Sequence, residues 1–149
     1  MPSEESIASA SYILSFYNDI ESVTNAYSSY LNVLVRIQDR YGMKDKDKKE
    51  KEKKLESEDE DALLGVAETL RVWITRCYIK ASTLQEKIPD LKNALAEIKG
   101  FYEKAISTSV IEKEVAEGFV LAINKTFVSG VLKDLLIQSK DIYSQLLKT

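Results

Sequence analysis

The sequence predicts an all-α protein, an antiparallel four-helix bundle built as a single domain from its 149 residues. Apolar residues recur every three or four positions over most of the chain, as they do along one face of an α-helix. Alternating apolar and polar runs bounded by Asn-Gly or Asp-Gly turns, the signature of strands, are absent from the sequence. The chain has only 5 Gly and 2 Pro and is 44% hydrophobic, which suits one continuous core.

The first predicted helix spans residues 4–41, which is about 57 Å at 1.5 Å per residue. Ser3 provides an N-cap hydroxyl and Gly42 a C-terminal stop. Spacings of three and four alternate without a break along its apolar face. That face consists of Ile13, Phe16, Ile20, Val23, Tyr27, Tyr30, Leu34, Ile37 and Tyr41.

Residues 43–58 are predicted to form a charged linker. A Lys-rich run, KDKDKKEKEKK, is followed by the acidic run ESEDED, and Leu55 is the only large apolar residue between positions 44 and 61. Such composition favours a solvated connection. The alternative is a switchable charged loop that contacts a partner or an RNA backbone.

Two shorter helices are expected next, over residues 59–87 and from Pro89 to about residue 106. Pro89 disfavours helical geometry at Ile88 and suits the first turn of a new helix, so it separates the two. The acids at residues 58–61 suit the start of the earlier helix because its dipole favours negative charge there. Its expected apolar face is Leu63, Val66, Leu70, Trp73, Cys77, Ala81, Leu84 and Ile88.

A last long helix is predicted over residues 110–147, after a stop and N-cap in the Ser-Thr-Ser run at 107–109. Its small residues Gly118, Ala122, Thr126 and Ser129 would let a neighbouring helix approach closely, within the core or at a subunit interface. Across the four helices, the residues expected to be buried include Ile20, Leu34, Leu70, Trp73, Ile98, Phe119 and Phe127.

Composition excludes several kinds of chemistry. The chain has no His and a single Cys, so it lacks the side chains for a zinc finger, a His-carboxylate metal site, a Ser-His or Cys-His nucleophile pair or an internal disulfide. Gly-rich phosphate-loop motifs are also absent. Cys77 lies on the apolar face between Trp73 and Ala81, where a buried, inert thiol is expected. We therefore expect no enzyme activity, no cofactor and no bound metal.

The sequence also predicts the cellular compartment of the protein. The first residues, MPSEESIASAS, lack the order of charges and apolar residues of a signal peptide, and no run of about 18 apolar residues is present. A cytoplasmic protein without membrane contact is expected. Plentiful Lys, Glu and Ile with sparse amides and Met are typical of a hyperthermophile, here an archaeal one.

The four Arg residues give the candidate binding sites. Arg36 and Arg40 share one helix face, as do Arg76 and Lys80, because residues four apart are neighbours on a helix. With Arg71, these cations could contact RNA phosphates without reading sequence. Alternatively they pair with nearby acids such as Asp39, Glu68 or Glu86. The formal net charge of −3 argues against a generally basic binder.

Three stretches resemble the small helical subunit of type III, Csm-type CRISPR effector complexes. They are SASYILSFYNDIESV at 9–23, LRVWITRCYIKAS at 70–82 and FVLAINKTFVSGVLK at 119–133. The resemblance implies a non-catalytic antiviral-defence subunit that stacks head to tail and holds the guide–target RNA duplex. It carries over Arg71, Arg76 and Lys80 as backbone contacts. The sequence departs from the family at Ser82, where a basic residue is expected, and in its acidic charge.

Two alternatives use the same helices. One is a structural helical-bundle protein, such as a virion or cell-architecture subunit. The other is a scaffold subunit of a replication complex. All three hypotheses predict other protein subunits as partners. Only the CRISPR hypothesis also predicts binding to RNA and a stacked array of copies of this chain.

Overall fold

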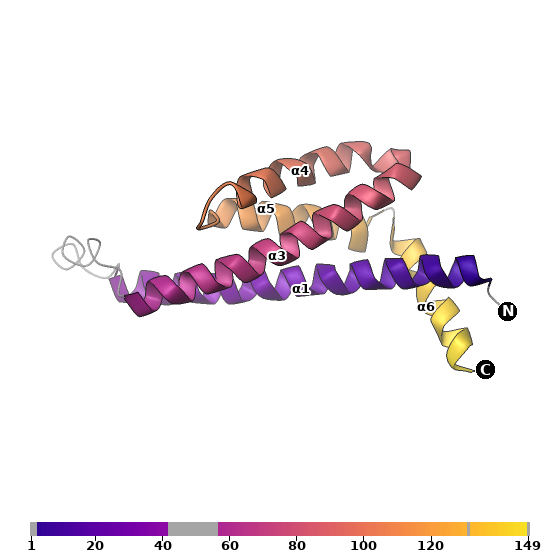
Figure 1. The fold of residues 1–149 in the computed structure, drawn as a ribbon, viewed down its shortest axis with the longest axis horizontal. Coiled ribbons are helices and arrows are strands. Elements are labelled where there is room, and N and C mark those ends of the chain that lie inside the picture. The colour runs from indigo at the N-terminus through magenta and orange to yellow at the C-terminus, as the bar shows by residue number, and fades with distance from the viewer. Residues whose placement is uncertain (1–2, 42–56, 131, 149) are drawn as a thin grey trace.

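The computed structural model describes residues 3–41, 57–130 and 132–148, and in these residues the chain is all-helical. Helix α1 (Glu4–Tyr41) runs the length of the molecule, and α3 (Ser57–Lys87) returns alongside it (Figure 1). A 3-10 turn, η1 (Pro89–Leu91), leads into α4 (Lys92–Ile106). Helix α5 (Lys113–Ile123) continues into the π-helical segment η2 (Asn124–Val128), and α6 (Lys133–Leu147) ends the fold.

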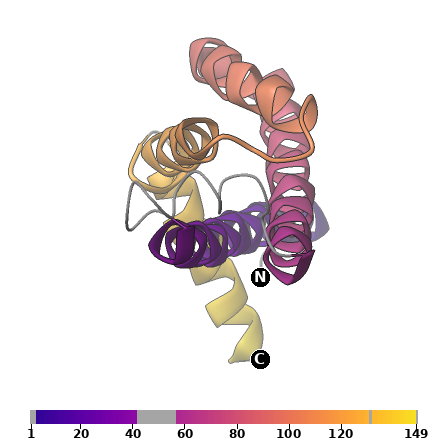
Figure 2. The ribbon, with the colours of Figure 1, turned by 90° about the vertical axis from the view of Figure 1, so that its left-hand side faces the viewer.

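The helices form two layers with one projecting element. Seen end on, α1 and α3 lie side by side, while α4 and α5 lie above them (Figure 2). Helix α6 crosses α1 near its N-terminal end and points away from the α4–α5 layer (Figure 1). The core therefore lies between the two layers, and α6 covers one end of α1 from outside them.

Helix α1 has the bounds that its sequence predicts. The Ser6 amide donates to the Ser3 hydroxyl at 3.1 Å, which confirms the N-cap because this bond satisfies one of the free amides of the first turn. Its buried apolar residues include Phe16, Ile20, Val23 and Tyr30. The proposed stop at Gly42 and most of the 43–58 linker lie outside the described residues, and residues 57 and 58 belong to α3.

Helix α3 buries a slightly different face from the one predicted. Ile74 is fully buried, whereas Trp73 is only partly buried and packs against the edge of the core. Both positions fit a spacing of three or four after Leu70, so periodicity alone does not choose between them. The smaller Ile74 and Ala67 are fully buried. The Trp73 indole instead contacts the Arg76 guanidinium, whose central carbon lies 4.9 Å from the ring centre.

Pro89 separates α3 from α4 as predicted. It occupies the first turn of η1, and Ile88 before it has an extended φ of −126° and ψ of 88°, the backbone that a following proline favours. Helix α4 ends at Ile106 with Ser107 as its C-cap, so the predicted stop is confirmed.

The single helix predicted over 110–147 is wrong. Its start lies at Lys113, with Glu112 and not the 107–109 run as N-cap, and the chain bends by 64° between Lys113–Val128 and Lys133–Leu147. The described part of the chain therefore has five α-helices where four were expected. Gly118 does permit the predicted close approach, because a Cβ there would lie 2.3 Å from Cε1 of the Phe101 ring on α4.

Most of the predicted core is buried. Leu70, Ile98 and Phe119 are fully inaccessible, and Ile20 and Phe127 nearly so. Leu34, like Trp73, is only partly buried against this core. These side chains join α1, α3, α4, α5 and η2 into one apolar cluster.

Candidate functional site

Arg71 forms hydrogen bonds to the connection between α4 and α5. Its guanidinium lies 2.5 Å from the Glu68 carboxylate, the pairing that spacing suggested. Its Nη2 donates to the carbonyl oxygens of Thr108 and Ser109, and its side chain is only 19% exposed. Three protein acceptors therefore engage Arg71, which agrees with the alternative that it pairs within the protein.

Arg76 and Lys80 converge on Asp19 of α1. Lys80 Nζ lies 2.6 Å from Asp19 Oδ2 and donates to the Ser15 hydroxyl at 2.6 Å. Arg76 Nε is 3.6 Å from the same carboxylate oxygen. The Asp19 side chain is only 6% exposed, so two cations stabilise a carboxylate that is largely shielded from water.

Exposure separates these two cations. The Lys80 side chain is 17% exposed and is committed to the α1–α3 interface, whereas the Arg76 side chain is 53% exposed and reaches solvent over Trp73. Arg76 therefore keeps part of its guanidinium accessible to a ligand. Lys80 presents little of its ammonium group.

Arg36 and Arg40 lie toward the C-terminal end of α1. Arg40 Nη1 contacts Asp59 Oδ2 at 2.7 Å and ties the end of α1 to the first turn of α3. Arg36 is exposed. The 21 helical positions from Asp19 to Arg40 span about 30 Å, so this pair lies far from Arg76.

The five predicted cations thus do not form one patch. Arg71 faces the α4–α5 connection, Lys80 and Arg76 face α1, and the Arg36–Arg40 pair lies at the other end of α1. Arg36, Arg40 and Arg76 are exposed residues, and Arg40 and Arg76 also form ion pairs with acids of the protein.

Cys77 is fully buried, as predicted. Burial raises the pKa of its thiol to about 12, and the nearby Asp19 carboxylate adds to the rise. A thiol that stays protonated at neutral pH is a poor nucleophile, which supports the structural role expected for it.

Two tyrosines of α1 make contacts that the sequence did not predict. Tyr30 is buried, and its hydroxyl donates to the main-chain carbonyl of Ile111. Burial and the neighbouring Glu117, to which it is hydrogen-bonded, raise the pKa of Tyr27. The side chain of Tyr41 lies outside the described residues.

An apolar groove lies where α1, α3 and α6 meet. It has a volume of about 470 Å³. Glu5 and Lys87 are the charged residues of its lining, and Ser9 and Thr83 add hydroxyls. Its apolar lining consists of Ala8, Tyr12, Ile13, Leu84, Ile88 and Leu135.

Sequence reasoning placed Ile13, Leu84 and Ile88 on apolar helix faces but did not bring them together. The missing information was the position of α6. If α6 continued α5 in a straight line, Leu135 would not lie beside Leu84 and Ile88 at the α1–α3 contact.

Comparison with protein-family models, with curated proteins and with solved structures gives no match. Within residues 3–41, 57–130 and 132–148, no group of three or more His, Cys, Asp or Glu side chains could hold a metal ion. In the same residues no single helix has the length and apolarity to cross a membrane, although the bent pair Lys113–Val128 and Lys133–Leu147 together would meet that test.

Proposed function

We propose that this chain is a non-catalytic helical subunit of a larger cytoplasmic assembly, and that it binds an amphipathic helix of another protein subunit. The observation that carries this proposal is the groove between α1, α3 and α6. Its volume of about 470 Å³ lies within the range of sites that bury several apolar side chains. Helices that dock in grooves insert side chains spaced three or four residues apart.

The groove also specifies the chemistry of its partner. Ile13, Ile88 and Leu135 offer an apolar floor, and Glu5 and Lys87 supply one charge of each sign. A complementary helix carries an apolar stripe, with a Lys or Arg facing Glu5 and an acid facing Lys87. Charges at the rim of an interface orient the partner, while the apolar floor supplies most of the affinity.

RNA binding is the second candidate, and two exposed cations favour it. Arg36 is exposed, and Arg76 is half exposed although it lies 3.6 Å from Asp19. In the CRISPR small-subunit reading, a stacked array of copies adds such contacts along an RNA duplex. Arg71, Lys80 and Arg40 have protein partners and would contribute less to phosphate binding.

The partner is tested by purifying the tagged protein from its native cells after chemical cross-linking, with mass spectrometry of proteins and sequencing of RNA. We expect an identified subunit cross-linked near Lys87, and its loss in Ile88→Glu, which places a charge in the groove. Ile79→Glu is the matched control, because Ile79 lies on α3, which ends just before Ile88, is 56% exposed and does not line the groove.

Retention of the cross-linked subunit by Ile88→Glu would contradict the groove proposal. The identity of the subunit then separates the assemblies: CRISPR proteins with guide RNA, virion or architectural proteins, or replication proteins. For RNA, the double variant Arg36→Ala and Arg76→Ala should weaken binding by the assembled complex and flatten its salt dependence, whatever the RNA sequence. Unchanged binding over a salt titration would exclude backbone contact by these two residues.

A further inference from the structure

The apolar pattern of the C-terminal third continues through a break in the helix. Val115, Phe119, Ile123 and Phe127 recur every four residues and are all buried. After the bend, Leu132 and Leu136 continue the buried face. The apolar spacing alone is therefore compatible with both a bent and a straight connection between α5 and α6.

The bend is made by η2 and Gly130. In η2 the Ser129 amide donates to the Asn124 carbonyl at 3.0 Å, a bond five residues long instead of four. A Cβ at Gly130 would lie 2.6 Å from the carbonyl oxygens of Lys125 and Thr126. Because these acceptors are main-chain atoms that cannot rotate away, the bent conformation requires glycine at this position.

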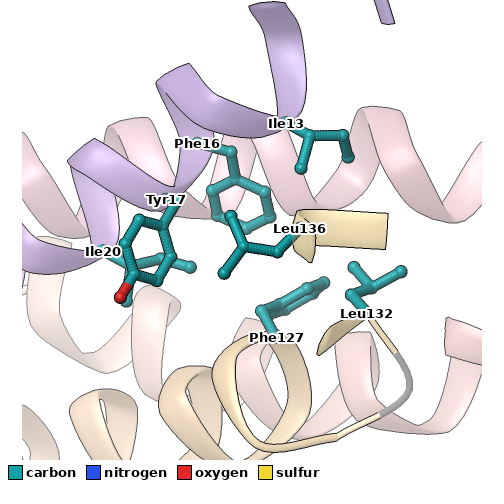
Figure 3. Close-up of a pocket in the computed structure, with 7 residues that line it drawn as sticks. All are labelled: Ile13, Phe16, Tyr17, Ile20, Phe127, Leu132 and Leu136. Atoms are coloured by element: carbon teal, nitrogen blue, oxygen red, sulfur yellow. The ribbon is translucent and has the colours of Figure 1, made fainter. Parts of the chain in front are cut away.

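Beyond the bend, α6 packs against the N-terminal half of α1. A small apolar cavity marks the contact (Figure 3). It is lined from α1 by Ile13, Phe16, Tyr17 and Ile20, from η2 by Phe127, from α6 by Leu136 and from the N-cap of α6 by Leu132. Its volume is about 10 Å³, so the facing side chains nearly fill it. Lys140 adds a contact over the Tyr17 ring at 5.1 Å.

From these observations we propose that α6 exchanges between two copies of this chain. In the exchanged form, η2 and Gly130 adopt regular α-helix, and α6 of each copy occupies the α1 surface of the other. The occupant is a second copy because the closed chain already shows that this α6 fits this surface. Exchange of an identical element repeats the same contacts between chains and makes a closed dimer.

The exchanged form differs from the closed form only at the hinge, η2 and Gly130, and in which chain α6 contacts. Straightening restores four-residue hydrogen bonds in place of the π-helical ones and relieves the need for glycine at 130. The α6–α1 contact is the same in both forms, so the hinge and the protein concentration decide the equilibrium. This proposal does not depend on a partner bound in the α1–α3–α6 groove.

Gly130→Ala tests the hinge. Alanine clashes with two carbonyls in the bent form but suits a straight helix, so the variant should dimerise with a Kd at least about 10-fold lower than that of the parent chain. The matched controls are Gly65→Ala and Gly100→Ala, at helical positions where an added Cβ meets nothing within 4 Å. Sedimentation velocity over a concentration series measures all four proteins. A Gly130→Ala chain that folds and stays monomeric over the same range as the controls would overturn the proposal.

A second experiment keeps Gly130 and so does not depend on that variant folding. Ile13→Glu damages the α1 surface and Leu136→Lys damages α6, both at the cavity of Figure 3. Each variant alone carries one damaged contact in every closed chain. Mixed at high concentration, they should form a heterodimer in which one α1–α6 contact is wholly native and the other pairs Glu with Lys.

Native mass spectrometry of the mixture, with one variant labelled by ¹⁵N, identifies this heterodimer. Its mass should dominate the dimer signal over either homodimer. If the two variants remain separate monomers while circular dichroism shows both to be helical, α6 does not exchange and the proposal is wrong.

Discussion

Helix α1 meets α3 and α6 in two different ways. Directional polar contacts join α1 to α3: the Tyr12 hydroxyl donates to the Lys80 carbonyl at 3.1 Å, and Lys80 reaches Asp19 at 2.6 Å. The α1–α6 contact is formed mainly by apolar side chains around Phe16 and Leu136. Directional contacts fix the register of two helices, whereas apolar contacts fix mainly the area that they cover. The polar contacts therefore hold α1 and α3 of the same chain in one register. The apolar α1–α6 contact, in contrast, can also form with the α6 of another copy.

The largest expected difference between the two interfaces is in core truncation. Leu70 of α3 is fully buried, so Leu70→Ala should lower the free energy of unfolding by about 4 kcal/mol. Leu136 of α6 is 8% exposed, and Leu136→Ala should cost about 2 kcal/mol. Urea denaturation measures both changes. Equal losses would remove the distinction between the two interfaces.

Hydrogen exchange sharpens the same comparison. Leu136→Ala should accelerate amide exchange in α6 while α3 keeps its protection, because α6 can detach without opening the two-layer core. Uniform acceleration over all helices would contradict this independence.

The next effect tests the polar contacts between α1 and α3. Asp19→Ala leaves Lys80 largely buried without its carboxylate and should cost about 3 kcal/mol, less than a fully enclosed pair because Arg76 still reaches water. Glu103→Ala is the control, since Glu103 pairs with Lys99 at 4.0 Å with both side chains well exposed, and it should change stability by less than about 0.5 kcal/mol. A loss at Asp19 no larger than that at Glu103 would show that the ion pairs do not hold α3.

The effect expected to be smallest near neutral pH is the contribution of Cys77 to the pH dependence of stability, because the thiol stays protonated there in both the folded and the unfolded chain. Its pKa is about 12 in the folded chain against 9.0 as the ordinary value, so between these two pH values the unfolded chain has lost the proton that the folded chain keeps. Stability should therefore fall as pH rises through this window, by up to about 1.4 kcal/mol per pH unit. Cys77→Ala removes this contribution, and the slope of its unfolding free energy against pH should be shallower. An unchanged slope would show that the thiol ionises alike in both states.

The N-terminal half of the fold was predictable because its signals agree. Ser3 and an unbroken apolar spacing define α1, and Pro89 marks the end of α3. The bend before α6 was not predictable, because the step from Phe127 to Leu132 keeps the buried face after one π-helical turn. A single Gly130 in an apolar helix is tolerated too often to indicate a break.

The cations were harder to place, because spacing on α3 does not show which side of the helix meets α1. A signal was present at Asp19, a lone acid between Phe16 and Ile20 on the buried face of α1. A carboxylate in that position needs a cation from a neighbouring helix, and Lys80 and Arg76 supply it.

The bond between Tyr30 and Ile111 also has a consequence for the synthesis of the chain. The two residues are separated by 81 positions, so the Tyr30 hydroxyl finds its acceptor only after α3, α4 and the connection that follows α4 have left the ribosome. Until then the apolar face of α1 can pair with α3 alone. The chain therefore emerges with an incomplete helical pair that is open to chaperones, and translation must pass α5 before the core can close.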